Sequence, residues 1–252
     1  MGYFDNDSKT EEWLIKRRGK CTASENWKLL PTVKQNKDTL WSTTALTYIE
    51  SRALEVSTKY YDKPELNEVE ALRHGKANEY PAAERYMQET KNYSMTYLGD
   101  DNPTFLPCPS LIEESGGSPD IVNIVDNGIG DGLVKIDYGC EIKNPVNPAY
   151  HFRRLRWSSQ WDIKENYISC YTQIQDLIRI TGAYGWDFIS FDERQLAKSK
   201  QIKIIEVKPD RKFIDNLELR IHLAVKEKYK ILSAHMGVEL KCKQDYLDFV
   251  NS

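Results

Sequence analysis

Apolar and polar residues alternate along residues 133–143, a pattern that predicts a β-strand. The expected apolar face consists of Ile136, Tyr138, Cys140 and Ile142. Glu141 and Lys143 then share the opposite face. Another apolar run, residues 121–125, precedes this strand, and a polar, glycine-rich segment separates the two. The pair predicts a β-hairpin that brings Asp120, at the start of the first run, beside Glu141.

The rest of the pattern predicts helices on both sides of a sheet-forming region. The expected helices are a short one ending at Gly19, one beginning near Thr22 or Ser24, and others over about 39–56, 66–90, 165–181 and 210–235. The further strands are expected at 92–98, 186–191 and 201–207, with residues 104–110 as an irregular connection. These elements predict an α/β protein of one domain, 1–252. It would comprise a helical part of about 1–90, a sheet-containing core of about 91–207 and a C-terminal helix of about 210–235.

The composition is that of a folded protein with nearly balanced charge. Of the 252 residues, 35 are basic and 38 are acidic, so the formal net charge is −3. This balance argues against a simple basic DNA coat, but not against a nucleic-acid enzyme with locally gathered basic residues. The five cysteines are scattered without zinc-ligand spacing, and no run is long enough to span a bilayer. Because no apolar leader is present, we expect a reducing cytoplasm and no membrane partner.

Asp120, Glu141 and Lys143 together suit metal-assisted hydrolysis of a phosphodiester. Carboxylate oxygens are the ligands that Mg²⁺ prefers, and a nearby lysine can orient or help deprotonate a water and offset charge on the phosphate. A lone Glu-x-Lys is more commonly an exposed ion pair of little consequence. The aspartate that the hairpin brings close favours the catalytic interpretation.

Four other positions are ambiguous from the residues alone. Glu79 lies on a helix face that is otherwise apolar or small, either as a surface residue or as an inward ligand. The basic residues 16–18, close to a predicted helix start, form either an anion site or a solvated helix end. Gln173 is expected on an inner helix face, where it needs a hydrogen-bond partner. The basic and aromatic residues 151–157 suit either a nucleic-acid contact or the edge of an amphipathic helix.

Four motifs, in the same order along the chain, resemble those of one nuclease family. Pro119-Asp120 with Glu141-Ile142-Lys143 is similar to the signature of the PD-(D/E)XK nucleases. The other three resemble the lambda-phage exonuclease group of viral recombination nucleases, of the YqaJ type. They are Trp13-x-x-x-Arg17-x-Gly19-x-x-Thr22-Ala23-Ser24, Gly75-x-x-x-Glu79 and Gln173-x-Gln175. This chain departs from the family at Ile121, where glycine is usual, and in a longer separation between Asp120 and Glu141 than in the lambda-phage enzyme. Loop extension of this kind costs little entropy.

The resemblance implies a restriction-endonuclease-like core, a central mixed β-sheet flanked by helices, with a site for two Mg²⁺ ions or for Mn²⁺ in their place. Asp120 would bridge the ions, Glu141 and the backbone carbonyl of Ile142 would complete one site, and Glu79 would serve the other. Lys143 would position the nucleophilic water. The residues implied in holding the 5′-terminal phosphate are Arg17, Ser24, Ser118 and Gln173.

The implied activity is that of a 5′–3′ exonuclease. Such an enzyme digests one strand of linear double-stranded DNA and leaves 3′ overhangs for phage-type homologous recombination. Relatives form ring-shaped trimers that encircle DNA and work with a single-strand annealing protein, so we expect both here. A structure-specific or restriction-type endonuclease would use the same metal site without a 5′-phosphate pocket, and a catalytically silent DNA-binding scaffold is a third hypothesis. The intact acidic residues and lysine argue against the scaffold.

Overall fold

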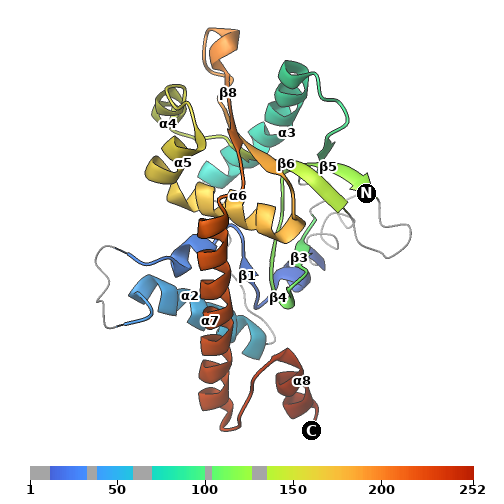
Figure 1. Ribbon diagram of the computed structural model, residues 1–252, viewed down its shortest axis with the longest axis vertical. Coiled ribbons are helices and arrows are strands. Elements are labelled where there is room, and N and C mark those ends of the chain that lie inside the picture. Colours follow the sequence, from blue (N-terminus) through green and yellow to red (C-terminus); the bar gives the residue numbers. More distant parts are fainter. Residues whose placement is uncertain (1–11, 33–38, 59–69, 100–103, 127–134) are drawn as a thin grey trace.

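Two sheets of unequal size form the centre of the protein, and helices surround them. The computed structural model describes residues 12–32, 39–58, 70–99, 104–126 and 135–252 (Figure 1). In the larger sheet, of order β2-β5-β6-β7-β8, strand β6 runs parallel to β7 and the other neighbours are antiparallel. Its strands are β2 (Thr96–Tyr97), β5 (Ile121–Asp126), β6 (Lys135–Lys143), β7 (Gly185–Phe191) and β8 (Ile202–Val207).

The smaller sheet joins the N-terminal part of the chain to the larger one. Its strands, in the order β1-β4-β3, are β1 (Cys21–Thr22), β4 (Leu111–Gly117) and β3 (Leu106–Cys108). Strand β1 pairs in parallel with the end of β4, Thr22 lying opposite Gly116. From the end of β4 the chain passes through Ser118 and Pro119 directly to Asp120 and β5. The predicted motif at residues 117–120 therefore lies where the two sheets meet.

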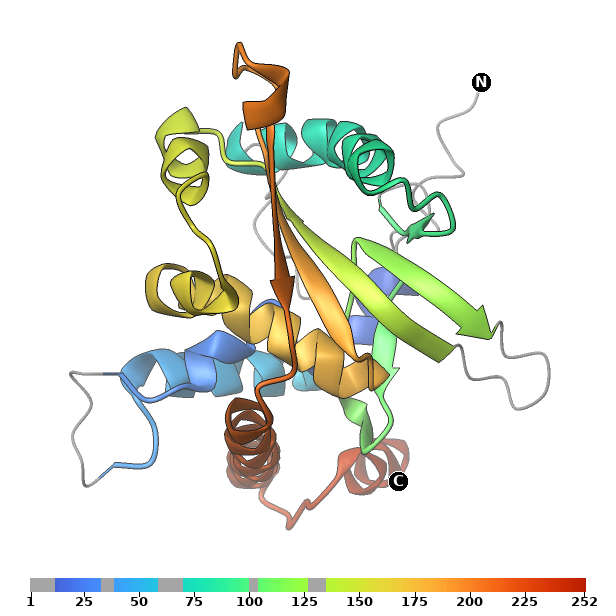
Figure 2. The same cartoon turned by 45° about the horizontal axis from the view of Figure 1, so that its top comes forward.

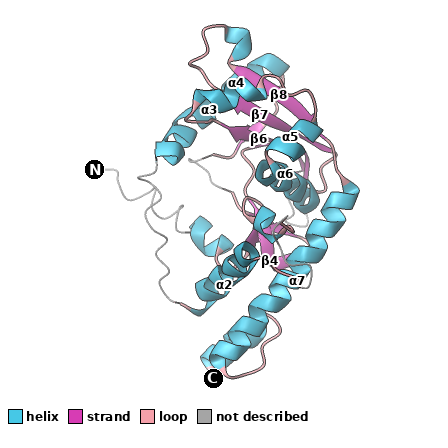
Figure 3. Ribbon diagram, turned by 90° about the vertical axis from the view of Figure 1, so that its left-hand side faces the viewer, coloured by secondary structure: helices cyan, strands magenta, loops and turns pink. Residues whose placement is uncertain are grey.

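Helices cover both faces of the larger sheet (Figure 2). On one face, α3 (Glu70–Thr90) packs Tyr86 and its neighbours against Ile121 and Ile189. On the other face lies α6 (Ile168–Thr181). The remaining helices are α2 (Thr43–Ser57), α4 (Pro148–Arg154), α5 (Gln160–Asn166), α7 (Arg211–Met236) and α8 (Lys243–Asn251), with short 3₁₀ helices η1 (Asn26–Leu29) and η3 (Lys198–Lys200). The long helix α7 packs along α2 and continues past the sheet (Figure 3).

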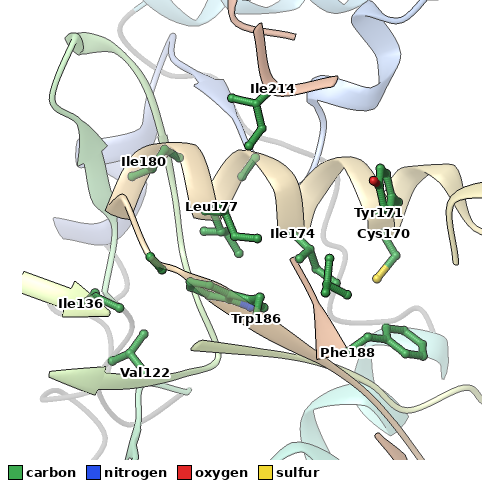
Figure 4. Packing of buried hydrophobic residues seen from close by; sticks show 14 of the residues in the cluster. Val122, Ile136, Cys170, Tyr171, Ile174, Leu177, Ile180, Trp186, Phe188 and Ile214 are labelled. Atoms are coloured by element: carbon green, nitrogen blue, oxygen red, sulfur yellow. The ribbon is translucent and has the colours of Figure 1, made fainter. Parts of the chain in front are cut away.

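The main core lies between α6 and the sheet. Ile174 and Leu177 of α6 point toward Trp186 of β7, and all three side chains are fully buried (Figure 4). Each such side chain contributes about 1.5–3 kcal/mol through burial. Gly182, with a φ of 71°, ends the helix in the left-handed conformation that glycine adopts without strain. This packing fixes the position of α6 relative to β6 and β7.

The prediction of one continuous apolar face on β6 is wrong at Ile136. The pairing between β5 and β6 shifts by one residue near Asp137, where Asn123 pairs with Tyr138 and Ile124 with Ile136. Such a bulge reverses the alternation of side chains. Ile136 consequently packs on the α6 side of the sheet, whereas Cys140 and Ile142 pack on the α3 side.

Other elements differ from the predictions in extent. The helix predicted over 165–181 is α6, which begins only at Ile168 because the backbone at Tyr167 (φ −149°, ψ 58°) is not helical; residues 165–166 belong to α5. Strand β1 and η1 take the place of the helix predicted to begin near Thr22 or Ser24, and residues 104–110 contain β3. Strand β2 is much shorter than residues 92–98. The hairpin tip and the first residues of the helix predicted over 66–90 lie outside the described residues. None of the described helices is both long and apolar enough to cross a membrane.

Candidate active site

Glu141 and Lys143 lie side by side near the end of β6. The ammonium Nζ of Lys143 donates to Oε1 of Glu141 at 2.5 Å and to Oε1 of Gln173, on α6, at 3.3 Å. Glu141 is 1% exposed, whereas the side chain of Lys143 is 25% exposed, so the carboxylate of this ion pair is buried and its ammonium partner is partly open to water. A buried carboxylate depends strongly on such a partner, because removing the partner leaves an uncompensated charge.

Asp120 reaches the same place from the junction between the two sheets. Its Oδ2 accepts a hydrogen bond from the backbone N–H of Ile142 at 2.6 Å. Ile142 lies between Glu141 and Lys143 on β6, so the carboxylate of Asp120 is held against the strand that carries the other two side chains. The predicted hairpin therefore brings Asp120, Glu141 and Lys143 into one cluster, the acid cluster.

Burial raises the pKa of both carboxyl groups in the acid cluster, and repulsion by other carboxylates adds to it for Asp120. For Asp120 burial is the main cause, the charges of Glu141 and Glu79 add to it, and Lys143 opposes them. Burial also raises the pKa of Glu141 against the attraction of Lys143. Burial by itself would lower the pKa of Lys143, but the attraction of Glu141 and smaller contributions from Cys170, Tyr167 and Asp120 together outweigh it and the pKa is raised. Lys143 therefore stays protonated, which suits it to orienting a water and offsetting negative charge rather than to accepting a proton.

The oxygen atoms at this place suit a hard divalent cation. Oε2 of Glu141 is buried and has no hydrogen-bond partner in the described part of the chain. Glu79 acts on Asp120 electrostatically while its Oε1 accepts from the Tyr97 hydroxyl at 3.2 Å. No three Asp, Glu, His or Cys side chains among the described residues are already gathered around a metal position. Since Mg²⁺ commonly keeps several waters and takes only one or two carboxylates, the residues present fit such an ion without forming a complete cage.

A pocket of about 170 Å³ brings together the four residues predicted to hold a terminal phosphate. We call it the Arg17 pocket, and its wall includes Trp13, Arg17, Ser24, Ser118 and Gln173. The pairing of β1 with β4 builds it: the N–H of Ala23 donates to the carbonyl of Gly116 at 2.9 Å. This hydrogen bond holds the segment that leads to Ser24 against the end of β4, and Ser118 follows β4 directly.

Trp13 and Arg17 lie one helical turn apart, so their side chains meet over the pocket. The guanidinium carbon of Arg17 is 4.2 Å from the ring centroid of Trp13, and Nε1 of Trp13 donates to Oγ of Ser118 at 2.9 Å. Burial lowers the pKa of Arg17; Glu25 opposes this and Arg52 adds to it. Nε of Arg17 is buried, and no described residue accepts a hydrogen bond from it. A bound anion would provide that acceptor.

Solved exonuclease structures are similar to this chain over most of its length. The alkaline exonuclease LHK-Exo from Laribacter hongkongensis has a TM-score of 0.67 and 22% identity, covering 89% of this chain and 95% of that one. Its complex with dAMP gives the same values. A phage-related exonuclease from Haemophilus somnus 129PT has a TM-score of 0.60 and 14% identity, covering 86% of this chain and 96% of its own. No protein-family model and no curated protein matches the chain.

The chain has the fold of the phage-type exonucleases. The predicted fold class, an α/β protein with a central mixed sheet flanked by helices, is thereby confirmed. In this exonuclease fold Asp120, Glu141 and Lys143 form the acid cluster, and Glu79 lies close enough to act on Asp120. The roles assigned to these residues, to the Ile142 carbonyl and to the Arg17 pocket stay predictions.

Sequence reasoning missed two features of this exonuclease fold. Trp13 was noted only as part of a motif, although its spacing of four from Arg17 places both on one helix face. The second feature is a larger pocket of about 640 Å³ that Lys143 also lines. It is formed by α4, α5 and the connection after β6, and the basic and aromatic composition of residues 151–157 was its only signal in the sequence.

Proposed function

We propose that the chain is a divalent-metal-dependent deoxyribonuclease, a 5′–3′ exonuclease that digests one strand of linear double-stranded DNA. The observation that carries the proposal is the position of Gln173. This side chain lines the Arg17 pocket, and its Oε1 accepts from Nζ of Lys143 in the acid cluster. A 5′-terminal phosphate held in the pocket would thus place the first phosphodiester of its strand beside the carboxylates. The likeness in fold to solved exonucleases supports the same chemistry.

Each part of the site has a distinct task in this proposal. Asp120, Glu141, Glu79 and the backbone carbonyl of Ile142 would hold two Mg²⁺ ions, or Mn²⁺ in their place. When bound, such ions polarise the phosphoryl group and stabilise the attacking and leaving oxygens. Lys143, kept cationic by Glu141, orients the attacking water and offsets charge that develops on the phosphate.

The Arg17 pocket sets the direction of digestion. Arg17 supplies a charge-assisted contact to the terminal phosphate, and the hydroxyls of Ser24 and Ser118 supply neutral donors. Gln173 connects the pocket to Lys143. Because only the 5′ end of a strand carries a terminal phosphate after ordinary cleavage, this pocket selects that end.

The proposal extends to the setting in which such an enzyme acts. Digestion from 5′ ends leaves 3′ overhangs, which are the substrates of phage-type homologous recombination in the cytoplasm. We further propose a ring-shaped homotrimer that encircles the duplex and a single-strand annealing protein as its partner. Sedimentation of the purified protein would test the trimer, and a monomeric species at working concentration would contradict it.

The test of the activity uses a DNA hairpin with one open end, a 5′-phosphate and a label on the 3′ terminus, next to a closed circular duplex. In Mg²⁺ we expect the labelled chain to shorten gradually while the circle stays intact. Asp120→Asn and Lys143→Met should lose cleavage and still retard DNA in a gel. Immediate release of the label would mean digestion from the 3′ end. Cutting of the circle would indicate an endonuclease, and no cleavage with Mg²⁺ or Mn²⁺ would leave a DNA-binding scaffold.

A further inference from the structure

The pocket of about 640 Å³ beside the acid cluster has no role in the function proposed above. We call it the Arg154 pocket. Lys143 and Asn144 form one end of its wall, and Tyr150, Arg153, Arg154 and Trp157 form much of the rest. Its volume lies in the range of ligand-binding clefts, about 300–1,000 Å³. The pocket therefore has room for a nucleotide next to the proposed catalytic lysine.

Arg154 is a buried cation that lacks an acidic partner among the described residues. It is 8% exposed, its Nη1 donates to Oγ of Ser190 at 3.4 Å, and the Tyr167 side chain is a further hydrogen-bond partner. Its guanidinium lies 4.7 Å from the ring centroid of Tyr167, and no carboxylate of the described residues lies within ion-pairing distance. Arginine is seldom buried without a counter-charge. A phosphate in the pocket would supply one.

Aromatic rings flank this charge on the open side of the pocket. Tyr150 is 52% exposed, and the guanidinium of Arg153 lies 5.8 Å from its ring centroid. Trp157 is partly buried, and its ring lies 5.9 Å from the guanidinium of Arg154. Alternating rings and guanidinium groups are typical of surfaces on which successive bases stack while their phosphates are neutralised. This arrangement favours the nucleic-acid interpretation of residues 151–157.

The two pockets lie at opposite ends of one short path. Gln173 belongs to the Arg17 pocket, Lys143 belongs to the Arg154 pocket, and the two side chains are hydrogen-bonded to each other. The acid cluster lies at this junction. We propose that the Arg154 pocket binds the second nucleotide of the strand being digested, with its base on Tyr150 and its 3′ phosphate at Arg153 and Arg154. This inference rests on the proposed function, because it assumes that the 5′ phosphate enters the Arg17 pocket.

Binding without divalent ions tests the inference independently of cleavage. The probes are duplexes with a 5′ overhang of two nucleotides. Three carry a 5′-phosphate: an intact one, one with an abasic second position, and one with an uncharged methylphosphonate between positions two and three. A fourth is intact but ends in a 5′-hydroxyl. The proteins are the wild type, Tyr150→Ala, Arg153→Ala and Arg156→Ala. Arg156 is the matched control because it is an exposed arginine of the same segment that does not line the pocket. Arg154 is left unchanged because it also packs in the core.

We expect the abasic position to weaken wild-type binding about tenfold but to change binding of Tyr150→Ala little. The methylphosphonate should likewise weaken wild-type binding about tenfold but weaken binding of Arg153→Ala less, because only Arg154 still contacts that phosphate in the variant. Arg156→Ala should respond as the wild type does in both comparisons. Equal responses of all four proteins would overturn the inference.

The outcomes separate this inference from the function on which it rests. If binding depends on the 5′ phosphate but not on the second nucleotide, the proposed function stands and the inference fails. If binding does not depend on the 5′ end at all, both are contradicted.

Discussion

Replacing Lys143 by methionine should destabilise the protein through Glu141, and the loss should depend on pH. Methionine keeps most of the volume of lysine but removes the ammonium that donates to Oε1 of Glu141 at 2.5 Å. The glutamate is 1% exposed, so it would remain as a buried carboxylate without its partner. The glutamate can avoid this buried, unpaired charge by binding a proton in the folded state.

The ordinary pKa of the glutamate sets an upper limit on the loss of free energy of unfolding. Protonation costs about 1.36 kcal/mol for each pH unit above the ordinary pKa of 4.5, or about 3.4 kcal/mol at pH 7 and about 0.7 kcal/mol at pH 5. For a chain of 252 residues, a loss of 3.4 kcal/mol corresponds to a fall of roughly 7–14 °C in Tm. In the variant the folded state binds more protons than the unfolded state between these pH values, so its stability relative to the wild type falls as the pH rises.

Denaturant unfolding of the wild type, Lys143→Met and the double variant Lys143→Met/Glu141→Gln, in EDTA at pH 5 and pH 7, measures the effect. The single variant should lose most at pH 7 and little at pH 5. The double variant carries no buried charge at this position and should recover most of the stability at pH 7. An equal loss at both pH values, or no recovery in the double variant, would refute the argument that Lys143 compensates the charge of Glu141.

Two further predictions concern other buried charges, at His151 and at Asp120. Burial lowers the pKa of His151, whose ring nitrogens contact Ser190 and the Lys200 carbonyl. The stability that this neutral imidazole contributes is fully present above the ordinary pKa of 6.5 and is lost as the pH falls toward the lowered value. His151→Gln should therefore lose less free energy of unfolding than the wild type between pH 6.5 and 5, and parallel curves would contradict this. Asp120→Asn removes a buried carboxylate that Glu141 and Glu79 repel, so in EDTA its Tm should match or exceed that of the wild type. Saturating Mg²⁺ should raise the Tm of the wild type by about 5 °C and leave that of Asp120→Asn unchanged; an equal rise would show that the ion binds elsewhere.

The sequence was sufficient to predict those parts of the site that depend on local pattern. Alternation placed Glu141 and Lys143 on one face, and the hairpin placed Asp120 beside them, as their contacts with each other and with Ile142 show. The same alternation failed at Ile136, because a bulge near Asp137 leaves no mark in the order of apolar and polar residues. A bulge depends on how two strands pair, which one strand alone does not encode.

The pattern of apolar and polar residues could not predict contacts between short segments that are distant in the sequence. Strand β1 has two residues, too few to show any periodicity. Its pairing with β4 nevertheless places Ser24 in the wall of the pocket that Ser118 also lines. The resemblance to a family supplied those residues, but not the hydrogen bond between Trp13 and Ser118. The Arg154 pocket similarly depends on the non-helical backbone at Tyr167, where α5 ends and α6 begins, and the sequence pattern did not predict this break.

The preference for a 5′-phosphate is the most direct test of the central claim, that the Arg17 pocket directs a strand into the acid cluster. The measurement is the initial rate of digestion of linear duplexes that differ only in a 5′-phosphate or a 5′-hydroxyl, for the wild type and for Arg17→Gln. A charge-assisted hydrogen bond contributes about 1.5–3 kcal/mol, so the wild type should digest the phosphorylated duplex roughly 10- to 100-fold faster. Arg17→Gln should lose most of this preference while retaining its rate on the hydroxyl end. Equal rates of the wild type on both ends, or an unchanged preference in Arg17→Gln, would contradict the account.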